Sequence, residues 1–282
     1  MKLTPIMLNN KVLEKALLTQ CPPDSRKKAE RDCKTYNSLA EDKPNEYNCP
    51  ICKNKRNIMI IKQLDDDEFD TVLTNCECVP RVNSDKMLKA SGLADYVISH
   101  TFDNFNAREE WQKQLLAKAK AFPNQDEAKC FFIGGNSGAG KTHICTATTY
   151  EFYKANKEIY YLEWREGLRK IRASSYDEKN EALMRKLKTV DVLFIDDLFK
   201  TIRTKGENYQ KPTKDEASIA WEIIAKRLDN GRFTIISTEC TLDEIMEIDE
   251  AIGSRIKRAS QSFGISIARD TCKNYRLFGF KK

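Results

Sequence analysis

The residues with the most recognisable chemistry form one glycine-rich loop: Gly135, Asn136, Ser137, Gly138, Ala139, Gly140, Lys141 and Thr142. This order fits the pattern G-x-x-x-x-G-K-S/T, in which glycines let main-chain N–H groups approach a polyphosphate. We expect Lys141 to neutralise the β- and γ-phosphates and Thr142 to offer its hydroxyl to Mg²⁺. A buried strand is predicted before the loop, at Cys130–Ile133, and a helix after it, at His143–Ala155. Because this pattern needs a strand, a loop and a helix in that order, nucleotide binding is favoured over a glycine-rich turn that matches by chance.

Two carboxylates follow a second apolar run. Asp196 and Asp197 come directly after Val190–Ile195, which is predicted to be a strand buried on both faces. Asp196 is placed to hold Mg²⁺ directly or through water, and Asp197 to orient or deprotonate an attacking water molecule. A plain turn is the alternative, but the phosphate loop earlier in the chain favours a metal site.

Two arginines are candidates for binding the γ-phosphate. Phosphoryl transfer needs positive charge there in the transition state. Arg255 lies in the segment Ile252–Ile256, and Arg276 lies in Asn274–Leu277. Each could instead be a surface cation, and the residues alone leave both interpretations open.

Two close pairs of cysteines indicate a metal centre. They form a C-x2-C pair and a C-x-C pair, at Cys49, Cys52, Cys76 and Cys78. Between the pairs, residues 58–61 and 71–74 are predicted to be the strands of a hairpin, joined by an acidic turn at residues 65–67. Four thiolates at the base of a hairpin make a structural Zn²⁺ site, whose binding free energy would hold so small a module together. Isolated thiols are the alternative, but they rarely fall in two tight pairs.

The composition describes a polar-surfaced chain with reduced thiols. The 282 residues carry 32% charged side chains, 10 cysteines and a net charge of +6. We expect a cytoplasmic protein, because neither a signal peptide nor a membrane-spanning apolar run is visible. From residue 252 onward, 8 Lys and Arg face one acid, which suits a polyanionic partner or a solvated charged face equally. Six further cysteines are scattered along the chain: Cys21, Cys33, Cys130, Cys145, Cys240 and Cys272. The last four of these are expected to be buried thiols.

The elements that position these residues alternate between strand and helix. Strands are predicted at residues 158–162 and 233–238, one long basic helical segment at 165–188, a polar loop at 200–214 and a helix at 216–228. Together with the strands named above, they define an α/β fold with a doubly wound parallel sheet.

Four parts of the chain are expected. They are an N-terminal helical segment at 1–46, a zinc-binding module at 47–80, a helical connector at 81–128 and the nucleotide-binding domain at 129–282. The first segment carries an apolar stripe, which suits either a partner protein or the chain's own domain. The connector contains Thr101–Phe105, whose two phenylalanines are interpreted as core anchors, with a place near an adenine as the alternative.

As a set, these motifs resemble the DnaC/DnaI-type helicase loaders, which are AAA+ ATPases, and especially their phage-borne branch. The resemblance runs from about Asn48 to the C-terminus and covers the cysteine pairs, Thr101–Phe105, Gly135–His143, Phe194–Asp197, Lys211–Thr213, Ile235–Glu239, Gly253–Ile256 and Asn274–Leu277. It implies an AAA+ P-loop ATPase domain with a parallel sheet, preceded by a small zinc-binding β-hairpin module and N-terminal helices.

The resemblance also implies roles for individual residues. Arg255 would be an arginine finger that reaches the ATP of a neighbouring subunit, and Arg276 a second sensor that reads the γ-phosphate in cis. The first sensor would be Thr238 or Glu239, between which the sequence does not choose. His143 ends the loop motif and joins the ATP-binding set. The expected cofactors are ATP, Mg²⁺ and Zn²⁺.

The function implied by the resemblance is helicase loading. Such a protein is an oligomeric ATPase, slow and stimulated by partners, that binds the replicative DNA helicase and assists its placement on single-stranded DNA. The N-terminal segment and the zinc module would dock on the helicase. Cations after the second strand are candidate DNA contacts, with a solvated helix face as the alternative: Arg165, Arg169, Lys170 and Arg172.

Two other functions remain open. One is an IstB-like accessory ATPase of a transposition system, which shares the AAA+ core. The other is a nucleotide-switch binding protein that hydrolyses little ATP. The zinc module favours the loader over the transposition ATPase.

Overall fold

The computed structural model describes residues 23–40, 49–65, 68–90, 94–173, 178–200 and 212–278. The chain divides into two compact units, Met1–Val79 and Pro80–Lys282, and each is described by itself. The predicted apolar stripe before residue 20, together with Cys21 and most of the predicted 200–214 loop, lies outside the described residues.

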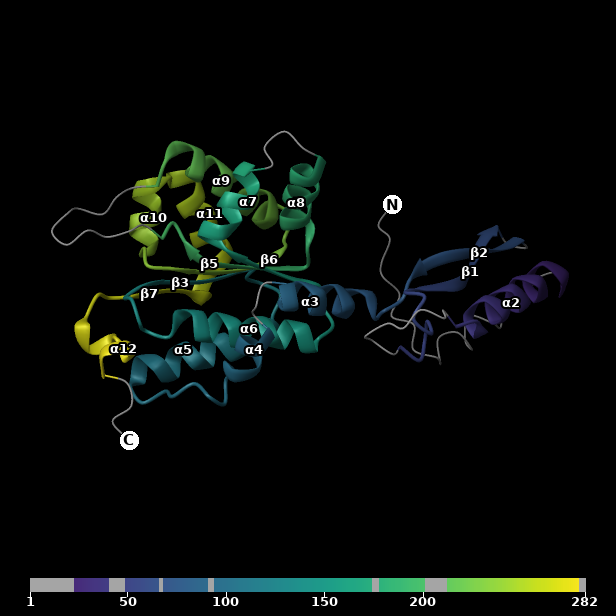
Figure 1. Cartoon of the computed structure of the whole chain (residues 1–282), viewed down its shortest axis with the longest axis horizontal. Coiled ribbons are helices and arrows are strands. Elements are labelled where there is room, and N and C mark those ends of the chain that lie inside the picture. The colour runs from purple at the N-terminus through teal and green to yellow at the C-terminus, as the bar shows by residue number, and fades with distance from the viewer. Residues whose placement is uncertain are drawn as a thin grey trace. The chain divides into compact units, whose positions relative to one another are not determined.

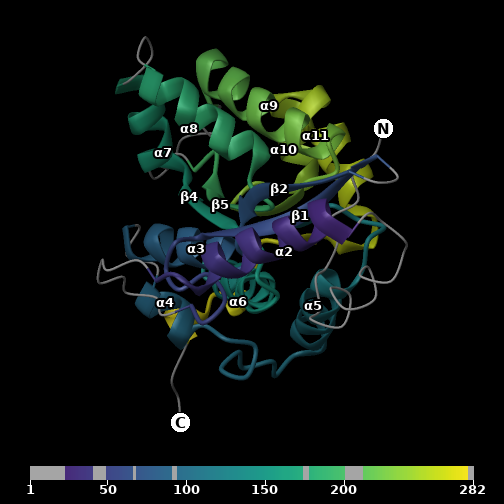
Figure 2. The ribbon, with the colours of Figure 1, turned by 90° about the vertical axis from the view of Figure 1, so that its right-hand side faces the viewer.

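The first unit is a helix packed along a β-hairpin. Helix α2 (Pro23–Ser38) lies against the antiparallel strands β1 (Asn57–Asp65) and β2 (Glu68–Asn75) (Figures 1 and 2). The Asn37 side chain donates to the Met59 carbonyl and accepts from the Met59 N–H, both at 2.9 Å. The predicted hairpin is confirmed, with longer strands than the apolar runs indicate.

The second unit is built on a five-stranded parallel sheet. Its strands lie in the order β4 (Ile159–Glu163), β5 (Val192–Leu198), β6 (Phe233–Thr238), β3 (Cys130–Gly135) and β7 (Gly264–Ile267). The predicted α/β class with a parallel sheet is confirmed. The short edge strand β7 has no counterpart in the sequence prediction, because four residues give too little periodicity to recognise.

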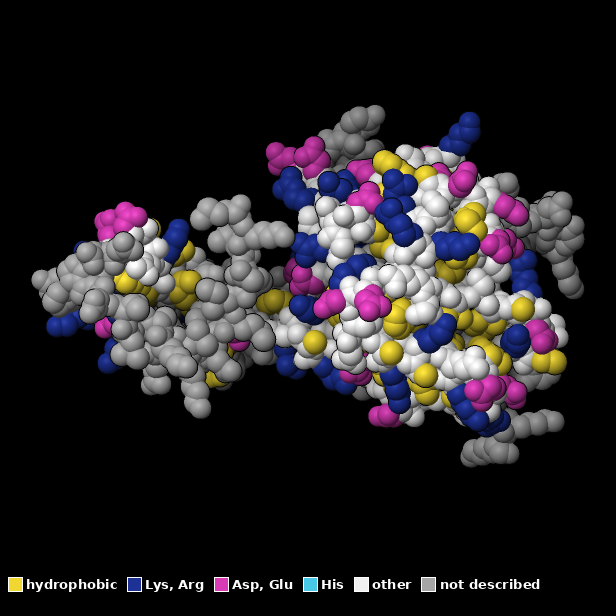
Figure 3. Space-filling model, turned by 180° about the vertical axis from the view of Figure 1, so that it is seen from behind, with side chains coloured by type: hydrophobic (Ala, Val, Ile, Leu, Met, Phe, Trp, Pro, Cys, Tyr) yellow, Lys and Arg dark blue, Asp and Glu magenta, His cyan; other side chains and the backbone are white. Residues whose placement is uncertain are grey.

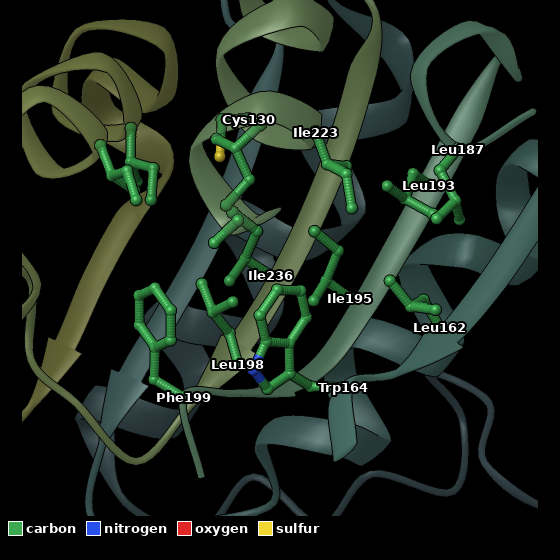
Figure 4. Close-up of a cluster of buried hydrophobic side chains, with 14 of the residues drawn as sticks. Cys130, Leu162, Trp164, Leu187, Leu193, Ile195, Leu198, Phe199, Ile223 and Ile236 are labelled. Atoms are coloured by element: carbon green, nitrogen blue, oxygen red, sulfur yellow. The ribbon is translucent and has the colours of Figure 1, made fainter. Parts of the chain in front are cut away.

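Helices cover both faces of this sheet (Figure 1). One face carries α6 (Lys141–Lys154); the other carries α7 (Trp164–Ala173), α8 (Glu178–Thr189), α9 (Lys214–Asp229), α10 (Leu242–Ile248) and α11 (Glu250–Ser260). Alternate residues of β3 enter different core clusters. Phe131 and Ile133 join the α6 side, while Cys130 and Phe132 join the cluster in Figure 4. Burial on both faces explains why the strands read as unbroken apolar runs.

The predicted connector contains three helices, α3 (Val79–Ala90), α4 (Ala94–Ser99) and α5 (Glu110–Ala121). Helix α3 is anchored to the edge strand β4. The Ile159 N–H donates to Ser84 Oγ at 2.9 Å, and the Tyr161 N–H donates to Met87 Sδ at 3.1 Å. These bonds satisfy main-chain donors at an edge that no further strand of the described sheet pairs with.

The prediction of one long helical segment at 165–188 is wrong. The structure has two helices there, α7 and α8, on either side of residues 174–177. Leu168 and Ile171 of α7 and Leu187 of α8 are all buried in the same core cluster. The two helices also contact each other, so they cover this cluster side by side.

The prediction of a buried thiol is wrong for one of the four cysteines. Cys130, Cys145 and Cys240 are buried as predicted, but Cys272 is exposed. It lies in a short turn whose geometry is set by Asp270, because the Asp270 carboxylate accepts a hydrogen bond from the Cys272 N–H at 2.9 Å. The polar neighbours of Cys272 decide its place at the surface.

A buried arginine ties α9 to the sheet. Arg227 is 0% exposed, and its guanidinium donates to the Leu187, Val190 and Phe233 carbonyls at 2.8, 2.9 and 2.6 Å and to Thr234 Oγ1 at 3.1 Å. Burial lowers its pKa to about 9, so it stays charged at neutral pH. Carbonyls at the ends of α8, β6 and their loops therefore depend on one side chain for their hydrogen bonds.

Arg227→Met is expected to lower the free energy of unfolding by about 3 kcal/mol, because several buried carbonyls lose their donor. Chemical denaturation of the whole chain measures this change. The control is Arg232→Met, which removes only a half-exposed ion pair to Asp191 and should cost at most about 1 kcal/mol. Equal losses for the two variants would contradict this account of Arg227.

Candidate functional site

The glycine-rich loop joins β3 to α6 with a backbone that only glycine adopts easily. Gly135, Gly138 and Gly140 have φ angles of 100°, 73° and 81°. A Cβ on Gly135 would lie 2.0 Å from the Ile267 carbonyl oxygen, and one on Gly138 would lie 1.9 Å from Asn274 Oδ1. The glycines of the motif are thus required by backbone conformation and by close neighbours at the same time.

The C-terminal segment braces this loop from outside. The Asn136 N–H donates to the Ile267 carbonyl at 3.1 Å, and the Tyr275 N–H donates to the Gly138 carbonyl at 3.0 Å. The Asp270 N–H donates to Asn136 Oδ1 at 3.1 Å. A cavity of about 280 Å³ lies between loop and segment, and Ser137, Glu239 and Arg269 are among its lining residues.

Lys141 holds a positive charge inside the loop. Its side chain is 7% exposed, and Nζ donates to the carbonyls of Gly135 and Asn136 at 3.1 and 2.7 Å. Burial lowers the pKa of Lys141, and the negative charges of Glu239 and Asp197 oppose that shift. An ammonium that is held by neutral carbonyls and attracted by acids only at longer range is suited to binding a phosphate.

Asp196 lies at the centre of a hydroxyl network. Thr142 Oγ1 donates to its Oδ1 at 3.1 Å, Ser237 Oγ also donates to Oδ1, and the Tyr161 hydroxyl donates to Oδ2 at 3.1 Å. Burial raises the pKa of Asp196, as does the neighbouring Asp197 charge, while the hydrogen bonds lower it. The carboxylate and the Thr142 hydroxyl are oxygen ligands of the type that Mg²⁺ prefers, so this pair fits the metal of a bound nucleotide.

Asp197 is held in an unusual conformation. Its φ of 58° is left-handed, and the β5–β6 register shifts between Ile195 and Leu198. The Asp197 N–H donates to Ser237 Oγ at 3.1 Å, and its carboxylate forms an ion pair with Lys200 Nζ at 2.5 Å. Both carboxylates lie within the last residues of β5, whereas the sequence prediction places them just after the strand.

The two candidate first sensors differ in their surroundings. Thr238 is buried, and its hydroxyl donates to the Leu198 carbonyl at 2.6 Å and accepts from the Cys240 N–H at 3.0 Å. Its hydrogen bonds therefore go to the main chain. Glu239 lines the cavity beside the loop, and its charge acts on Lys141.

The two arginines lie in different parts of the second unit. Arg255 is on α11, where Nη1 donates to the Ala251 carbonyl at 3.1 Å and Nε lies 3.7 Å from Asp229 Oδ1. No contact in the described part of the chain brings Arg255 to the loop. Arg276 is exposed on the short helix α12 (Tyr275–Phe278), which directly follows the segment that braces the loop.

The charges of Asp196 and Arg276 both act on Tyr96 of α4. Burial raises the pKa of Tyr96, the Asp196 charge raises it further and the Arg276 charge lowers it. Asp196 and Arg276 thus act electrostatically on one phenol, although they lie on different elements.

The expected core-anchor stretch packs beside the loop. Phe102 and Phe105 are both buried, and the Phe105 ring lies edge-on to His143 with 5.3 Å between centroids. His143 Nε2 is hydrogen-bonded to the Thr101 carbonyl at 2.8 Å, and burial lowers the pKa of His143. A Cβ on Gly140 would meet the Phe105 ring at 3.0 Å. The phenylalanines are core residues, and one of them also limits the space around the loop.

Sequence reasoning missed three residues of this network. Ser237 had a usable signal, because it stands beside Asp196 once β5 and β6 are predicted to be parallel neighbours. Tyr161 had none, since a tyrosine within a strand is usually a packing residue. Lys200 pairs with Asp197 through a left-handed turn that the sequence does not indicate.

The four predicted zinc ligands converge in the first unit. The sulfur atoms of Cys49, Cys52, Cys76 and Cys78 lie within 4.8 Å of one another and are buried. The Cys49–Cys76 and Cys52–Cys78 sulfur distances are 3.8 and 3.6 Å. A tetrahedron with Zn–S bonds of about 2.3 Å has edges of about 3.8 Å, so these thiols fit a structural Zn²⁺ site.

Local turns present the thiols to this centre. The Lys53 N–H donates to the Cys49 carbonyl at 2.9 Å, and the Val79 N–H donates to the Cys76 carbonyl at 3.0 Å. The Cys49 N–H donates to Asn54 Oδ1 at 3.0 Å. Burial raises the pKa of the Cys76 thiol to about 11, and a bound cation would favour the thiolate form of this ligand.

The predicted DNA-contacting cations lie on α7 with exposed side chains: Arg165, Arg169, Lys170 and Arg172. Lys170 forms an ion pair with Glu166 at 2.7 Å, and Arg172 forms one with Asp215 at 2.8 Å. On the side of the second unit opposite to that seen in Figure 1, Lys and Arg side chains are interspersed with acidic ones (Figure 3). No helix among the described residues is long and apolar enough to cross a membrane.

Comparison with known proteins agrees with this geometry. The family described as the bacterial DnaA ATPase domain matches residues 98–262. The uncharacterized protein YqaM of Bacillus subtilis is 28% identical, with 89% of this chain and 92% of that protein covered. The phage-like element PBSX protein XkdC of Bacillus subtilis is 26% identical, with coverages of 86% and 93%.

A solved structure shares the fold of the second unit. The crystal structure of the DnaC helicase loader superposes with a TM-score of 0.50 at 17% identity, covering 61% of this chain and 98% of that one. The predicted AAA+ fold is confirmed, and so is the resemblance to DnaC-type loaders and to proteins of phage elements.

Cys76→Ser is expected to abolish zinc binding and unfold the first unit, because the metal supplies much of the stability of so small a module. Elemental analysis of the purified full chain should find one Zn²⁺ per wild-type chain and none in the variant. Cys272→Ser, which removes an exposed thiol of the second unit, should keep the full zinc content. A folded wild-type protein without zinc would overturn the assignment.

Proposed function

Since the chain belongs to the family of the bacterial DnaA ATPase domain, we propose that it is an ATP-dependent loader that binds the replicative DNA helicase and assists its placement on single-stranded DNA. The family relation itself gives a replication-related AAA+ ATPase domain. The observation that carries the finer proposal is the convergence of Lys141, Thr142 and Asp196 in a chain that also has a four-cysteine module. The shared fold of the DnaC helicase loader supports it.

In this proposal the loop binds ATP and its Mg²⁺. Main-chain N–H groups of residues 137–142 and the Lys141 ammonium hold the phosphates, and His143 fixes the start of α6 through Thr101. Thr142 and Asp196 would hold Mg²⁺, which supplies positive charge to the phosphate oxygens. Asp197 orients or deprotonates the attacking water, and Glu239 is preferred over Thr238 as the first sensor because it faces the cavity.

The ion pair between Asp197 and Lys200 favours slow hydrolysis by the isolated chain. The carboxylate that would act on water is already engaged at 2.5 Å. A partner that moves Lys200 would release Asp197, so stimulated turnover is expected. The same pair is the observation that favours the second candidate function, a nucleotide switch that hydrolyses little ATP.

Arg255 and Arg276 complete the site from two directions in this proposal. Arg276 follows the brace on the loop, which suits a sensor in cis. Arg255 projects from α11 beside Asp229, which suits a finger that acts on the ATP of a neighbouring copy. Self-association through the AAA+ domains is therefore part of the proposed function.

The first unit is proposed to bind the helicase, and α7 to bind DNA. Large apolar side chains are exposed in the first unit, including Leu39, Ile51 and Leu73 at 58, 52 and 52%. Exposed apolar side chains of this size are typical of protein-binding surfaces. The α7 cations suit the phosphates of single-stranded DNA, which need closely spaced positive charge rather than base-specific contacts.

The four proposed parts keep the boundaries expected from the sequence. Residues 1–46 and 47–80 would form the docking and zinc-binding parts. Residues 81–128 would be the connector and 129–282 the ATPase domain. Zn²⁺ in this scheme is structural and takes no part in ATP hydrolysis.

ATP hydrolysis by the full chain is expected to be slow alone and to rise when replicative helicase and single-stranded DNA are added together. A steady-state phosphate-release assay measures this, with Lys141→Ala as the control that loses nucleotide binding. Fast hydrolysis by the isolated chain would count against a loader. ATP binding without stimulation would favour the nucleotide switch.

Arg255→Ala is expected to keep ATP binding and to lower stimulated hydrolysis by about three orders of magnitude. Mixing it with Lys141→Ala should restore part of the activity, because the second variant supplies the arginine and the first supplies an intact ATP site. Arg258→Ala is the matched control, since Arg258 lies on the same helix and also contacts Asp229. Loss of ATP binding in Arg255→Ala, or no recovery on mixing, would remove Arg255 from this role.

A further inference from the structure

Tyr161 is built into the sheet beneath the proposed ATP site. It lies in β4 opposite Phe194 of β5, and its ring packs against the Phe194 ring with 5.2 Å between centroids. It is partly buried and packs against the core cluster on the α6 face of the sheet. Its main-chain N–H donates to Met87 Sδ of α3, so both its backbone and its ring are held in place.

The register brings the Tyr161 hydroxyl to Asp196. Asp196 follows Phe194 by two residues, so both side chains project from the same face of β5. Two residues of strand span about 6.6 Å, a distance that a tyrosine side chain covers along the sheet. The hydroxyl reaches Asp196 Oδ2 at 3.1 Å.

The two carboxylate oxygens of Asp196 are thereby given different neighbours. Thr142 and Ser237 donate to Oδ1, which faces the start of α6, and Tyr161 donates to Oδ2. A carboxylate bonded on one oxygen only can rotate about its terminal torsion, since that torsion is soft. With Oδ2 also bonded, the plane of the carboxylate is fixed.

We propose that Tyr161 is a positioning residue for the metal of bound ATP: its hydroxyl holds Oδ2 so that Asp196 presents Oδ1 to the Thr142 side. This inference rests on the proposed ATP site and adds to it a residue that touches neither nucleotide nor metal. Hydrogen-bond partners of metal ligands commonly change metal affinity by about 10- to 100-fold when removed. Tyr161 should therefore affect the Mg²⁺-dependent part of nucleotide binding and leave the metal-independent part unchanged.

Tyr161→Phe tests this directly. The variant keeps the ring on Phe194 and removes one hydroxyl, so its unfolding midpoint should stay close to that of the wild type. A fluorescent, non-hydrolysable ATP analogue is titrated into the full chain in excess Mg²⁺ and again in excess EDTA. The wild type should bind more tightly with Mg²⁺. Tyr161→Phe should bind equally in EDTA and lose about tenfold of the gain due to Mg²⁺.

Tyr160→Phe is the matched control. Tyr160 is the preceding residue of β4 and packs against the cluster on the opposite face of the sheet, so its hydroxyl is remote from Asp196. It should keep the full Mg²⁺ effect. An undiminished Mg²⁺ effect in Tyr161→Phe would overturn the inference, as would an equal loss in EDTA. Absence of analogue binding by the wild type would instead refute the proposed ATP site itself.

Discussion

The second unit depends on supplying hydrogen-bond donors to one buried carboxylate. Asp196 is 5% exposed, and transferring a charged carboxylate from water to such a place costs several kcal/mol unless it is hydrogen-bonded. Its donors come from α6, β4 and β6, three elements that are far apart in the sequence. The sheet satisfies it by placing β5 between β4 and β6, with the start of α6 close to Asp196. The strand order of the sheet is therefore also what supplies the hydrogen-bond donors of the site.

In the described part of the chain, the first unit has a much smaller apolar core than the second unit. Its described residues form the helix α2 and one hairpin, and several of its large apolar side chains are exposed. Four buried sulfur atoms at the hairpin base can take the place of a core once a cation binds them. The chain thus combines a unit held together by apolar burial on two faces of a sheet with a unit whose four buried thiols fit a structural metal ion.

Much of this could be predicted from the sequence where residue type and spacing act locally. The loop from Gly135 to Thr142 requires glycines at left-handed positions, and the cysteine pairs require fixed spacing, so both were recognisable. The continuous apolar runs identified the buried strands. The split between α7 and α8 was not predicted, because both helices pack on one core cluster and apolar spacing alone does not show that they reach it separately.

The site residues that the sequence did not predict were missed for a different reason. Tyr161 and Lys200 acquire their roles from register and from a left-handed turn, and neither is visible in composition or periodicity. Arg227 is a further example, since a basic residue in a helix normally predicts a solvated face, yet here it bonds four groups of α8, β6 and the loop after α8. Tertiary hydrogen bonding decided each of these places.

The hydrogen bonds between the C-terminal segment and the phosphate loop couple the stability of these two distant parts of the chain. The Tyr275 N–H bonds to the Gly138 carbonyl, and Asn274 fills the space beside that glycine. A ligand that stabilises this loop geometry must therefore also stabilise the docked segment, and by the same free energy the docked segment must raise the affinity for that ligand. Docking of residues 270–275 on the loop is in this sense linked to how fully the loop is occupied.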